Sequence, residues 1–323
     1  MKTNERLKIV CLGGGTGLAT VLRGLKKSVV DITAVVTVSD DGGSSGKLRR
    51  EMGVIPPGDI RNCLVALSEE ENFMARLFQY RFPETPSLSG HSLGNLLLTA
   101  VADITRSFTE GVARAGQVLA IRGKVLPVAL SPLTLQAVLA DGRQVSGESR
   151  IGHSRRPIKK LTIREKNQAH PEVIAAIKKA DMIVLGPGSL YTSLIANLLV
   201  GGVVPAIRQS RAVKVYVANI MTQPQETTGY TLSDHIRAIE KHGGKNIFPI
   251  VLVHHGPIKK NLLRNYAQGR AYPVRLDTKN LTDKKIIKAN LINSNSRDNF
   301  IRHDPEILAR TLLKVYRQER KIQ

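Results

Sequence analysis

IVCLGGGTG (9–17) is a continuous apolar run that ends in a glycine-rich loop, and LATVLRGLKK (18–27) after it has helical spacing. The β-branched run DITAVVTVSDD (31–41) follows. A strand, a helix and a second strand in this order form a βαβ unit, which requires a parallel sheet with a right-handed crossover. We therefore expect an α/β fold that is Rossmann-like and doubly wound, with a mainly parallel sheet.

Two further apolar runs end in small residues, VVTVSDDGGSSG (35–46) and MIVLGPGS (182–189). A strand followed by such a loop and a helix points free backbone N–H groups and the positive end of a helix dipole at one place, which suits an anion. Three loops of this kind predict a ligand with at least two phosphates. Neither standard fingerprint is complete, because Leu18 replaces the third glycine of the dinucleotide motif and Leu48 follows Lys47 where a P-loop has Ser or Thr.

Ligands of doubly wound sheets bind beyond the carboxyl ends of the strands, so we expect the loops at 13–17, 40–47, 186–192 and 219–227 to converge on one crevice. The candidate ligand-binding residues lie in these loops or at nearby helix starts: Gly13, Gly14, Gly15, Thr16, Gly17, Asp40, Asp41, Ser44, Ser45, Lys47, Asp59, Asn62, His91, Asn95, Gly186, Gly188, Ser189, Thr192, Asn219 and Thr222. The hydroxyl groups among them have helix capping as an alternative role, and for Ser189 the two roles are equally expected. His91 is interpreted as a neutral hydrogen-bonding group or a general base.

Three acids accompany the loops. Asp40 and Asp41 close the second predicted strand, where a dinucleotide-binding fold places an acid that accepts from a ribose hydroxyl. Asp59 follows a stiff Pro-Pro-Gly turn. Carboxylates beside phosphates also hold Mg²⁺, which makes Asp41 and Asp59 candidate metal ligands, whereas a turn or a cap is the alternative role of each acid. The chain has no G-x-S-x-G elbow, no H-E-x-x-H pair and no cysteine in a nucleophile context.

The chain reads as one α/β domain over residues 1–323 whose core is split in sequence. The core is predicted at about 7–115 and 169–260, and short alternating segments predict a β-rich insert at about 116–168, with a hairpin at Asp141-Gly142. Residues 261–323 are predicted to be mixed and mainly helical, with a strand at YPVRL (272–276). A helix is expected to begin after Asp304 as N-cap, with Pro305 in its first position.

The composition predicts a cytoplasmic protein without membrane insertion. Its 323 residues are 42% hydrophobic but only 4% aromatic, which is typical of a parallel sheet covered by helices. Cys11 and Cys63 lie in apolar segments without metal-ligand spacing, so we interpret them as reduced core residues. The N-terminal apolar stretch is shorter than the core of a signal peptide, and the tract around 194–207 is too short and too interrupted to cross a bilayer.

The net charge of +22 needs a partner of opposite sign or an explanation. Nucleic acid is disfavoured as a partner, because no basic segment is interleaved with aromatic residues and no reading helix is evident. A phosphorylated ligand accounts for a few charges, and a solvated surface, with or without an acidic protein partner, accounts for most of them. The sequence leaves the oligomeric state open, a homo-oligomer included.

Six motifs occur in order along the chain: GGGTGL (13–18), VSDDGGSSGKLR (38–49), PPGDIRN (56–62), GHSLGNL (90–96), GPGSLYTS (186–193) and NIMTQPQETTGYT (219–231). With these motifs the chain resembles the bacterial gluconeogenesis factors of the YvcK type, within the CofD-like superfamily. The resemblance implies a cytoplasmic protein needed for normal cell shape and for growth on gluconeogenic carbon sources. It also implies a crevice that accepts a nucleotide diphosphate, either a UDP-sugar or an NAD-like dinucleotide.

The enzymatic branch of this superfamily is the 2-phospho-L-lactate transferases, which use Mg²⁺. The resemblance implies a second acid two residues beyond Asp59, but this chain has Arg61 there. A cation at this position weakens a two-carboxylate metal site and is able to pair with a ligand phosphate. We therefore expect a nucleotide-binding factor without catalytic residues, and an Mg²⁺-dependent transferase acting on a nucleotide diphosphate is the alternative.

Overall fold

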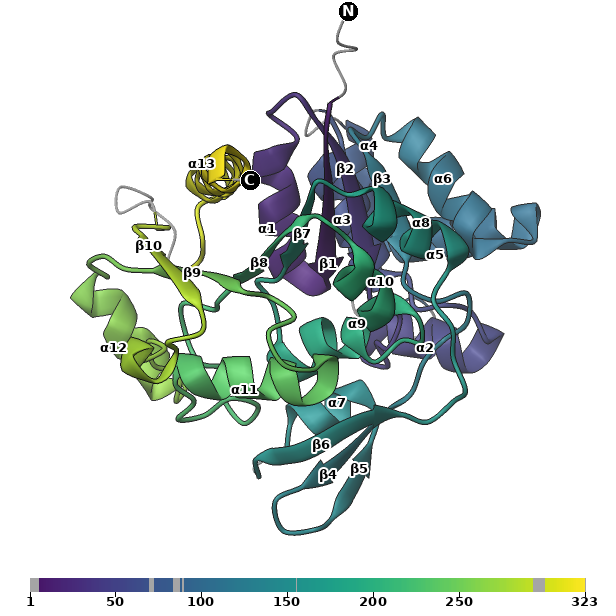
Figure 1. The fold of residues 1–323 in the computed structure, drawn as a ribbon. Coiled ribbons are helices and arrows are strands. Elements are labelled where there is room, and N and C mark those ends of the chain that lie inside the picture. The colour runs from purple at the N-terminus through teal and green to yellow at the C-terminus, as the bar shows by residue number, and fades with distance from the viewer. Residues whose placement is uncertain are drawn as a thin grey trace, which may run out of the picture.

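The computed structural model describes residues 6–69, 73–83, 88, 90–154, 156–292 and 300–322. Its main sheet has seven strands, and every pair of neighbours is parallel. The strands are β1 (Leu7–Gly13), β2 (Val30–Val36), β3 (Lys124–Pro127), β7 (Met182–Leu185), β8 (Val213–Val217), β9 (Ile250–His254) and β10 (Lys285–Ala289), in the order β10-β9-β8-β7-β1-β2-β3 (Figure 1). This arrangement confirms the predicted α/β, mainly parallel fold.

The continuous apolar runs form strands that are buried on both faces. In β1, Ile9 and Cys11 belong to one core cluster, whereas Val10 and Leu12 belong to the cluster on the other face. Cys11 and Cys63 are buried free thiols, as predicted, and burial raises the pKa of Cys11 to about 12. Both cysteines therefore serve as core residues.

Helices cover both faces of the main sheet. One core cluster contains side chains of α1 (Gly15–Leu25), α3 (Gly58–Leu67), α4 (Phe73–Gln79), α5 (Leu93–Thr105), α6 (Phe108–Val118) and α13 (Pro305–Ile322). The other contains side chains of α8 (Pro171–Lys179), the π-helical η1 (Leu190–Ile195), α9 (Ala196–Leu198), α10 (Val203–Gln209) and α11 (Leu232–Gly243). The start of α13 is confirmed, because Asp304 Oδ1 accepts from the N–H groups of Glu306 and Ile307, 2.9 Å from each.

A small antiparallel sheet lies beyond the main sheet, at the bottom of Figure 1. It consists of β4 (Leu135–Leu139), β5 (Gln144–Ser146) and β6 (Ile158–Ile163), and α7 (Glu148–Gly152) follows β5. The predicted hairpin is confirmed: Gly142 has φ 86° in the turn between β4 and β5, a conformation that favours glycine. One strand of the predicted insert belongs elsewhere, because β3 pairs with β2 in the main sheet.

The C-terminal third contains α12 (Lys260–Gln268), the 3₁₀ turn η2 (Thr278–Asn280), β10 and α13. The strand predicted at 272–276 is wrong. Pro273 makes a single antiparallel bridge to Met221, and Arg275 makes a single parallel bridge to Thr231. This segment therefore contacts two loops and does not extend a sheet. The strand of this region is β10, which continues the main sheet beside β9.

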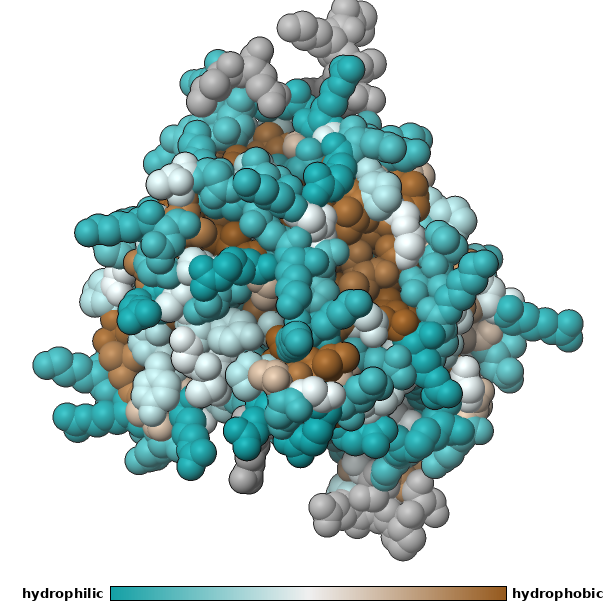
Figure 2. All heavy atoms as spheres, turned by 60° about the horizontal axis from the view of Figure 1, so that its bottom comes forward, coloured by the Kyte–Doolittle hydropathy of each residue, from teal (hydrophilic) through white to brown (hydrophobic). Residues whose placement is uncertain are grey.

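Hydrophilic side chains cover most of the face drawn in Figure 2, and hydrophobic residues are exposed mainly in the hollows between them. Within the described ranges no single helix is long and apolar enough to span a membrane, and only the pair Leu190–Leu198 and Val203–Gln209, bent by 71°, has the required length and composition together.

Candidate functional site

The site forms where the strand order of the main sheet reverses, between β1 and β7. Ligands of doubly wound sheets bind beyond the carboxyl ends of the strands at this place. β1 ends at Gly13, and its Leu12 pairs with Leu185, the last residue of β7. The loops that follow touch each other, since a Cβ atom on Gly17 would lie 2.3 Å from the carbonyl oxygen of Pro187. This close approach requires glycine at position 17.

A cavity of about 420 Å³ opens at this point. We call it the main cavity because of this position at the strand-order reversal, although hollows of about 750 and 580 Å³ lie elsewhere on the protein. Its walls come from four segments and α1: Gly14, Gly15, Thr16, Gly17, Thr20, Pro187, Gly188, Ser189, Ser193, Asn219, Ile220, Met221, Thr222, Gln223, Pro224, Tyr266, Ala271, Ile301, Arg302 and His303. Three of the four loops predicted to converge therefore do so. The fourth, 40–47, lines a neighbouring hollow.

The N-terminus of α1 presents backbone donors to the main cavity. Its N-cap, Gly14, has no side chain to cap the helix. The N–H of Gly15 donates to the carboxylate of Asp59. The N–H groups of Thr16 and Gly17 belong to the first turn, where the helix itself supplies no acceptor, and both residues line the cavity. Together with the helix dipole they give this wall of the cavity a positive potential, which favours an anion.

The loop after β7 holds a carboxylate of the protein itself. Glu226, 2% exposed, accepts from the N–H groups of Tyr191 (3.0 Å) and Thr192 (3.2 Å) through Oε1. The hydroxyl of Ser189 lies 2.7 Å from both of its carboxylate oxygens and 2.7 Å from Thr192 Oγ1. These donors are thus occupied internally. The structure favours a structural role for Ser189 and Thr192, although Ser189 also reaches the wall of the main cavity.

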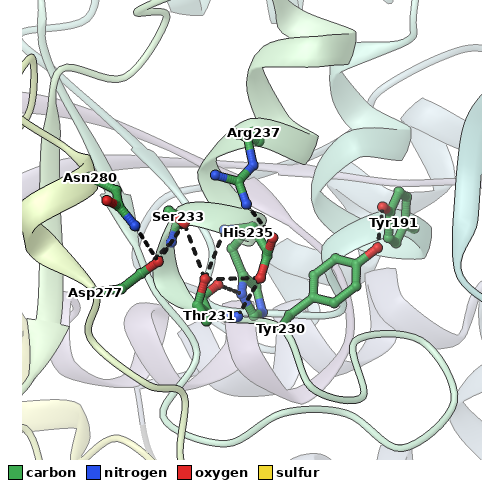
Figure 3. Close-up of polar contacts among 9 residues, drawn as sticks. Tyr191, Tyr230, Thr231, Ser233, His235, Arg237, Asp277 and Asn280 are labelled. Carbon is green, nitrogen blue, oxygen red and sulfur yellow. Dashed lines mark hydrogen bonds and ion pairs between the residues drawn. The ribbon is translucent and has the colours of Figure 1, made fainter.

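A polar network holds the end of the segment 219–231 and the start of α11 (Figure 3). The Tyr230 hydroxyl lies 2.9 Å from the Tyr191 hydroxyl, and Thr231 forms a capping box with Asp234 at the start of α11. Asp277 accepts from the N–H and the hydroxyl of Ser233, at 2.9 and 2.6 Å. Asn219 exchanges two hydrogen bonds with the backbone of Gly188 at the other end of the segment. The cavity wall at 219–224 is therefore anchored at both ends.

A second hollow, of about 210 Å³, lies beside the main cavity at the start of α2 (Gly43–Met52). It is lined by Asp40, Gly42, Gly43, Ser44, Ser45, Gly58, Asp59, Arg61, Asn62, Arg81 and Asn95. Its two serines have internal partners: Ser44 Oγ lies 3.1 Å from His91 Nδ1 and accepts from Asn95 Nδ2 at 3.0 Å, and Ser45 Oγ accepts from the N–H of Gly58. His91 thus positions Ser44 and does not line either hollow.

Three partly buried acids, Asp40, Asp59 and Glu148, lie in or close to the second hollow. Burial and the nearby carboxylate of Asp40 raise the pKa of Asp59 to about 6, against the opposing effects of the Gly15 N–H and Arg61. Burial and the neighbouring Asp59 also hold the pKa of Glu148 well above its ordinary value, although Ser39 donates to it at 2.8 Å. The fold therefore places two carboxyl groups, Asp59 and Glu148, where their pKa values lie above the ordinary range.

The proposed metal pair does not share one space. Asp41 Oδ1 accepts from the N–H of Ser149 at the start of α7, whereas Asp59 lines the second hollow together with Asp40. Arg61 lies in the same hollow. In the part of the chain that the structure describes, no group of three or more His, Cys, Asp or Glu side chains is arranged to hold a metal ion. Asp40 fits a pairing with Asp59 better than Asp41 does.

The remaining predicted residues have clear positions. Gly13 and Gly186 are packing positions, since Cβ atoms there would lie 3.3 Å from Leu18 Cβ and 3.1 Å from Leu194 Cδ1. Thr222 lines the main cavity and accepts from the Tyr272 N–H through Oγ1. Lys47 is exposed on α2 and lines neither space.

The family model described as 2-phospho-L-lactate transferase CofD matches residues 9–292. The chain belongs to the CofD family. Among its CofD-like relatives, the gluconeogenesis factor of Bacillus subtilis (strain 168) is 44% identical and aligns over 97% of this chain and 99% of its own. The gluconeogenesis factor of Halalkalibacterium halodurans is 50% identical over 84% of this chain and 85% of its own. These matches confirm the resemblance seen in the six motifs.

The same CofD fold is known experimentally. A crystal structure of a UPF0052 family protein from Bacillus halodurans superposes with a TM-score of 0.92, at 46% identity, and covers 96% of this chain and 100% of the other. The agreement extends over both the main sheet and the small sheet, because nearly the whole chain is covered.

Several site residues of this CofD family protein escaped the sequence analysis. Tyr266, Arg302 and His303 come from the C-terminal third, where no glycine loop marked them. Burial and the neighbouring His254 lower the pKa of His303 to about 3, so it faces the main cavity as a neutral ring. Glu226 lies within the motif at 219–231, which was the only signal for it.

Proposed function

We propose that this protein is a gluconeogenesis factor whose main cavity binds a nucleotide diphosphate, either a UDP-sugar or a dinucleotide. The observation that carries the proposal is the N-terminus of α1, where Asp59 accepts from the Gly15 N–H but Thr16 and Gly17 have no intrahelical acceptor and line a cavity at the reversal of strand order. Such a cavity suits a diphosphate, and its volume of about 420 Å³ lies in the range of small-molecule sites.

The remaining walls fit the rest of such a ligand. Tyr266 supplies an aromatic ring, Asn219 and Thr222 supply polar side chains, and Arg302 supplies a guanidinium able to form a forked pair with a phosphate. In this role the protein is a cytoplasmic factor that couples nucleotide levels to cell shape and to growth on gluconeogenic carbon sources. Binding alone serves this function, so no catalytic residue is required.

The test compares Arg302→Ala with Arg310→Ala. Arg310 is also exposed but lies on α13 outside the main cavity, so it is a matched control. Loss of a charged hydrogen bond to a phosphate is expected to weaken the binding of UDP-N-acetylglucosamine or NAD about ten- to hundredfold in Arg302→Ala. Equal affinities of the two variants would count against the main cavity as the site, and growth on gluconeogenic carbon is expected to follow the binding data.

The second hollow favours one alternative function, an Mg²⁺-dependent transferase of the 2-phospho-L-lactate transferase type. Asp40 and Asp59 face this hollow beside the N-terminus of α1, where a metal ion bound to both would contact a ligand phosphate. This alternative predicts release of a nucleoside monophosphate that is lost in Asp59→Asn. Recovery of intact nucleotide after incubation with Mg²⁺ would refute it.

A further inference from the structure

The exposed face of α13 carries a line of cations, which we call the α13 stripe. It consists of four exposed residues: Arg310, Lys314, Arg317 and Lys321. Their spacing of i, i+4, i+7 and i+11 places them on one face of the helix, whereas its apolar face packs into the core. α13 lies at the periphery of the molecule, beside α1 (Figure 1). The α13 stripe is therefore presented to solvent.

The carboxylates near the α13 stripe already have other partners. They form the ion pairs Lys27–Glu306 (2.5 Å), Lys285–Glu319 (2.6 Å) and Arg320–Asp181 (3.3 Å). In the described part of the chain, no carboxylate pairs with a member of the stripe. Like charges one turn apart on a helix repel each other, so four uncompensated cations favour a partner of opposite sign.

The spacing along the α13 stripe fits an acidic helix. Arg310 and Lys321 are eleven residues apart, which is about 16.5 Å along the helix axis, so successive cations lie about 5.5 Å apart. A second helix presents a side chain on one face about every 5.4 Å, and its carboxylates stay in register with all four cations. A strand presents one only about every 6.7 Å and loses this register.

Two other anionic surfaces fit the α13 stripe less well. Single-stranded nucleic acid is held by aromatic side chains that stack on its bases, but the only aromatic residue of α13 is Tyr316, and the Cζ atom of Arg320 already lies over its ring. A helix that binds at a membrane surface buries its apolar face in the lipid, whereas the apolar face of α13 is buried in the protein. A protein partner with carboxylates therefore fits best.

We propose that the α13 stripe docks an acidic helix of a partner protein, with one carboxylate opposite each cation. The members of the stripe line neither the main cavity nor the second hollow, so this surface is separate from the proposed nucleotide site. A surface of this kind accounts for part of the net charge of +22. Charge complementarity of exposed groups gives a fast, salt-sensitive association.

The test measures binding of the full chain to a fluorescent, alanine-based helical peptide that carries glutamate at the same i, i+4, i+7 and i+11 spacing. A second peptide of the same composition distributes its glutamates around the helix. The stripe variant is Arg310→Glu/Lys314→Glu/Arg317→Glu.

The control variant replaces three exposed cations in or beside β6, whose apolar side chains pack on the other face of the main sheet: Lys160→Glu/Arg164→Glu/Lys166→Glu. Each replacement alters the charge by two, so both triple variants lower the net charge from +22 to +16. The comparison therefore separates the α13 stripe from the overall charge.

The wild type and the control variant are expected to bind the matched peptide saturably at low salt. The stripe variant is expected to bind it about tenfold or more weakly, because three exposed ion pairs are lost and repulsion is added. Arg310→Gln/Lys314→Gln/Arg317→Gln is expected to bind several-fold more weakly, and it keeps the test valid if the stripe variant unfolds, which circular dichroism reports.

Three results would overturn the proposal: no saturable binding to the wild type, equal weakening in the stripe and control variants, or equal binding of the two peptides. Phosphatidylserine vesicles and a single-stranded oligonucleotide are titrated in the same way. Tighter binding of either, lost in the stripe variant, would overturn the proposal in favour of a membrane or a nucleic acid. Failure of UDP-N-acetylglucosamine to bind, with stripe-dependent peptide binding intact, refutes the proposed function alone.

Discussion

Replacement of Asp59 with Asn is expected to stabilise the protein above pH 6. Burial and the Asp40 carboxylate raise the pKa of Asp59 from its ordinary value of 3.8 to about 6. The folded state therefore binds this proton more tightly than the unfolded chain does, and folding stability falls as the pH rises from about 4 through 6. Asparagine is isosteric and neutral, so it keeps an acceptor for the Gly15 N–H and removes this loss.

The magnitude follows from the pKa difference. A change of about two units corresponds to about 3 kcal/mol of unfolding free energy, gained in full above pH 7 and absent near pH 4. Urea denaturation of wild type and Asp59→Asn at several pH values between 4 and 8 measures it. Because Glu148 is coupled to Asp59, the difference between the two proteins is the quantity to compare.

Asp141→Asn is the matched control. The Asp141 carboxylate is exposed in the β4–β5 turn, and its hydrogen bond from Arg143 lowers its pKa. Its replacement is therefore not expected to stabilise the protein at pH 8. A difference between Asp59→Asn and wild type that is independent of pH, or a destabilised Asp59→Asn at pH 8, would refute the reasoning.

Substitutions at three further positions test how the loops and α1 are held, all by denaturant titration. Gly17→Ala is expected to destabilise by about 1–3 kcal/mol, because its Cβ would lie 2.3 Å from the Pro187 carbonyl oxygen; an unchanged midpoint would contradict this contact. Gly24→Ala should cost a similar amount, since its Cβ would lie 1.9 Å from the Pro305 carbonyl oxygen and separate α1 from α13. Glu226→Ala leaves the amides of Tyr191 and Thr192 without an acceptor and removes a partner of the Ser189 hydroxyl, so it should cost roughly 3 kcal/mol or more. Glu226→Gln keeps an acceptor for the amides and should cost less; equal costs would refute the capping role.

The core of the fold was predictable because its strands and helix starts are set by residues close together in the sequence. The buried strands are continuous apolar runs, and the α13 start depends on the short-range cap at Asp304. The prediction of a strand at 272–276 was wrong. Pro273 and Arg275 each make one bridge, and the two bridges join different segments, so no ladder forms. β3 was assigned to the insert because its pairing with β2 bridges about ninety residues, which periodicity does not reveal.

The candidate site was predictable at its glycine loops but not at its side-chain partners. The approach of Gly17 to Pro187 requires glycine, and this constraint is visible in sequence. Glu226 accepts from the N–H donors of the third loop, but it lies 35 residues from Tyr191 in the sequence. The sequence analysis therefore treated these donors as available to a ligand. Arg61 was noted in the sequence, but its unpaired atoms follow only from three-dimensional packing.

The central claim is that the main cavity binds a nucleotide diphosphate. Calorimetric titration of the purified protein with UDP-N-acetylglucosamine, NAD and GDP, with and without Mg²⁺, followed by chromatography of the ligands, tests it most directly. The account predicts saturable binding of at least one nucleotide, recovered intact, and weaker binding in Arg302→Ala than in Arg310→Ala. Absence of binding for all three, or metal-dependent conversion to a nucleoside monophosphate, would contradict it.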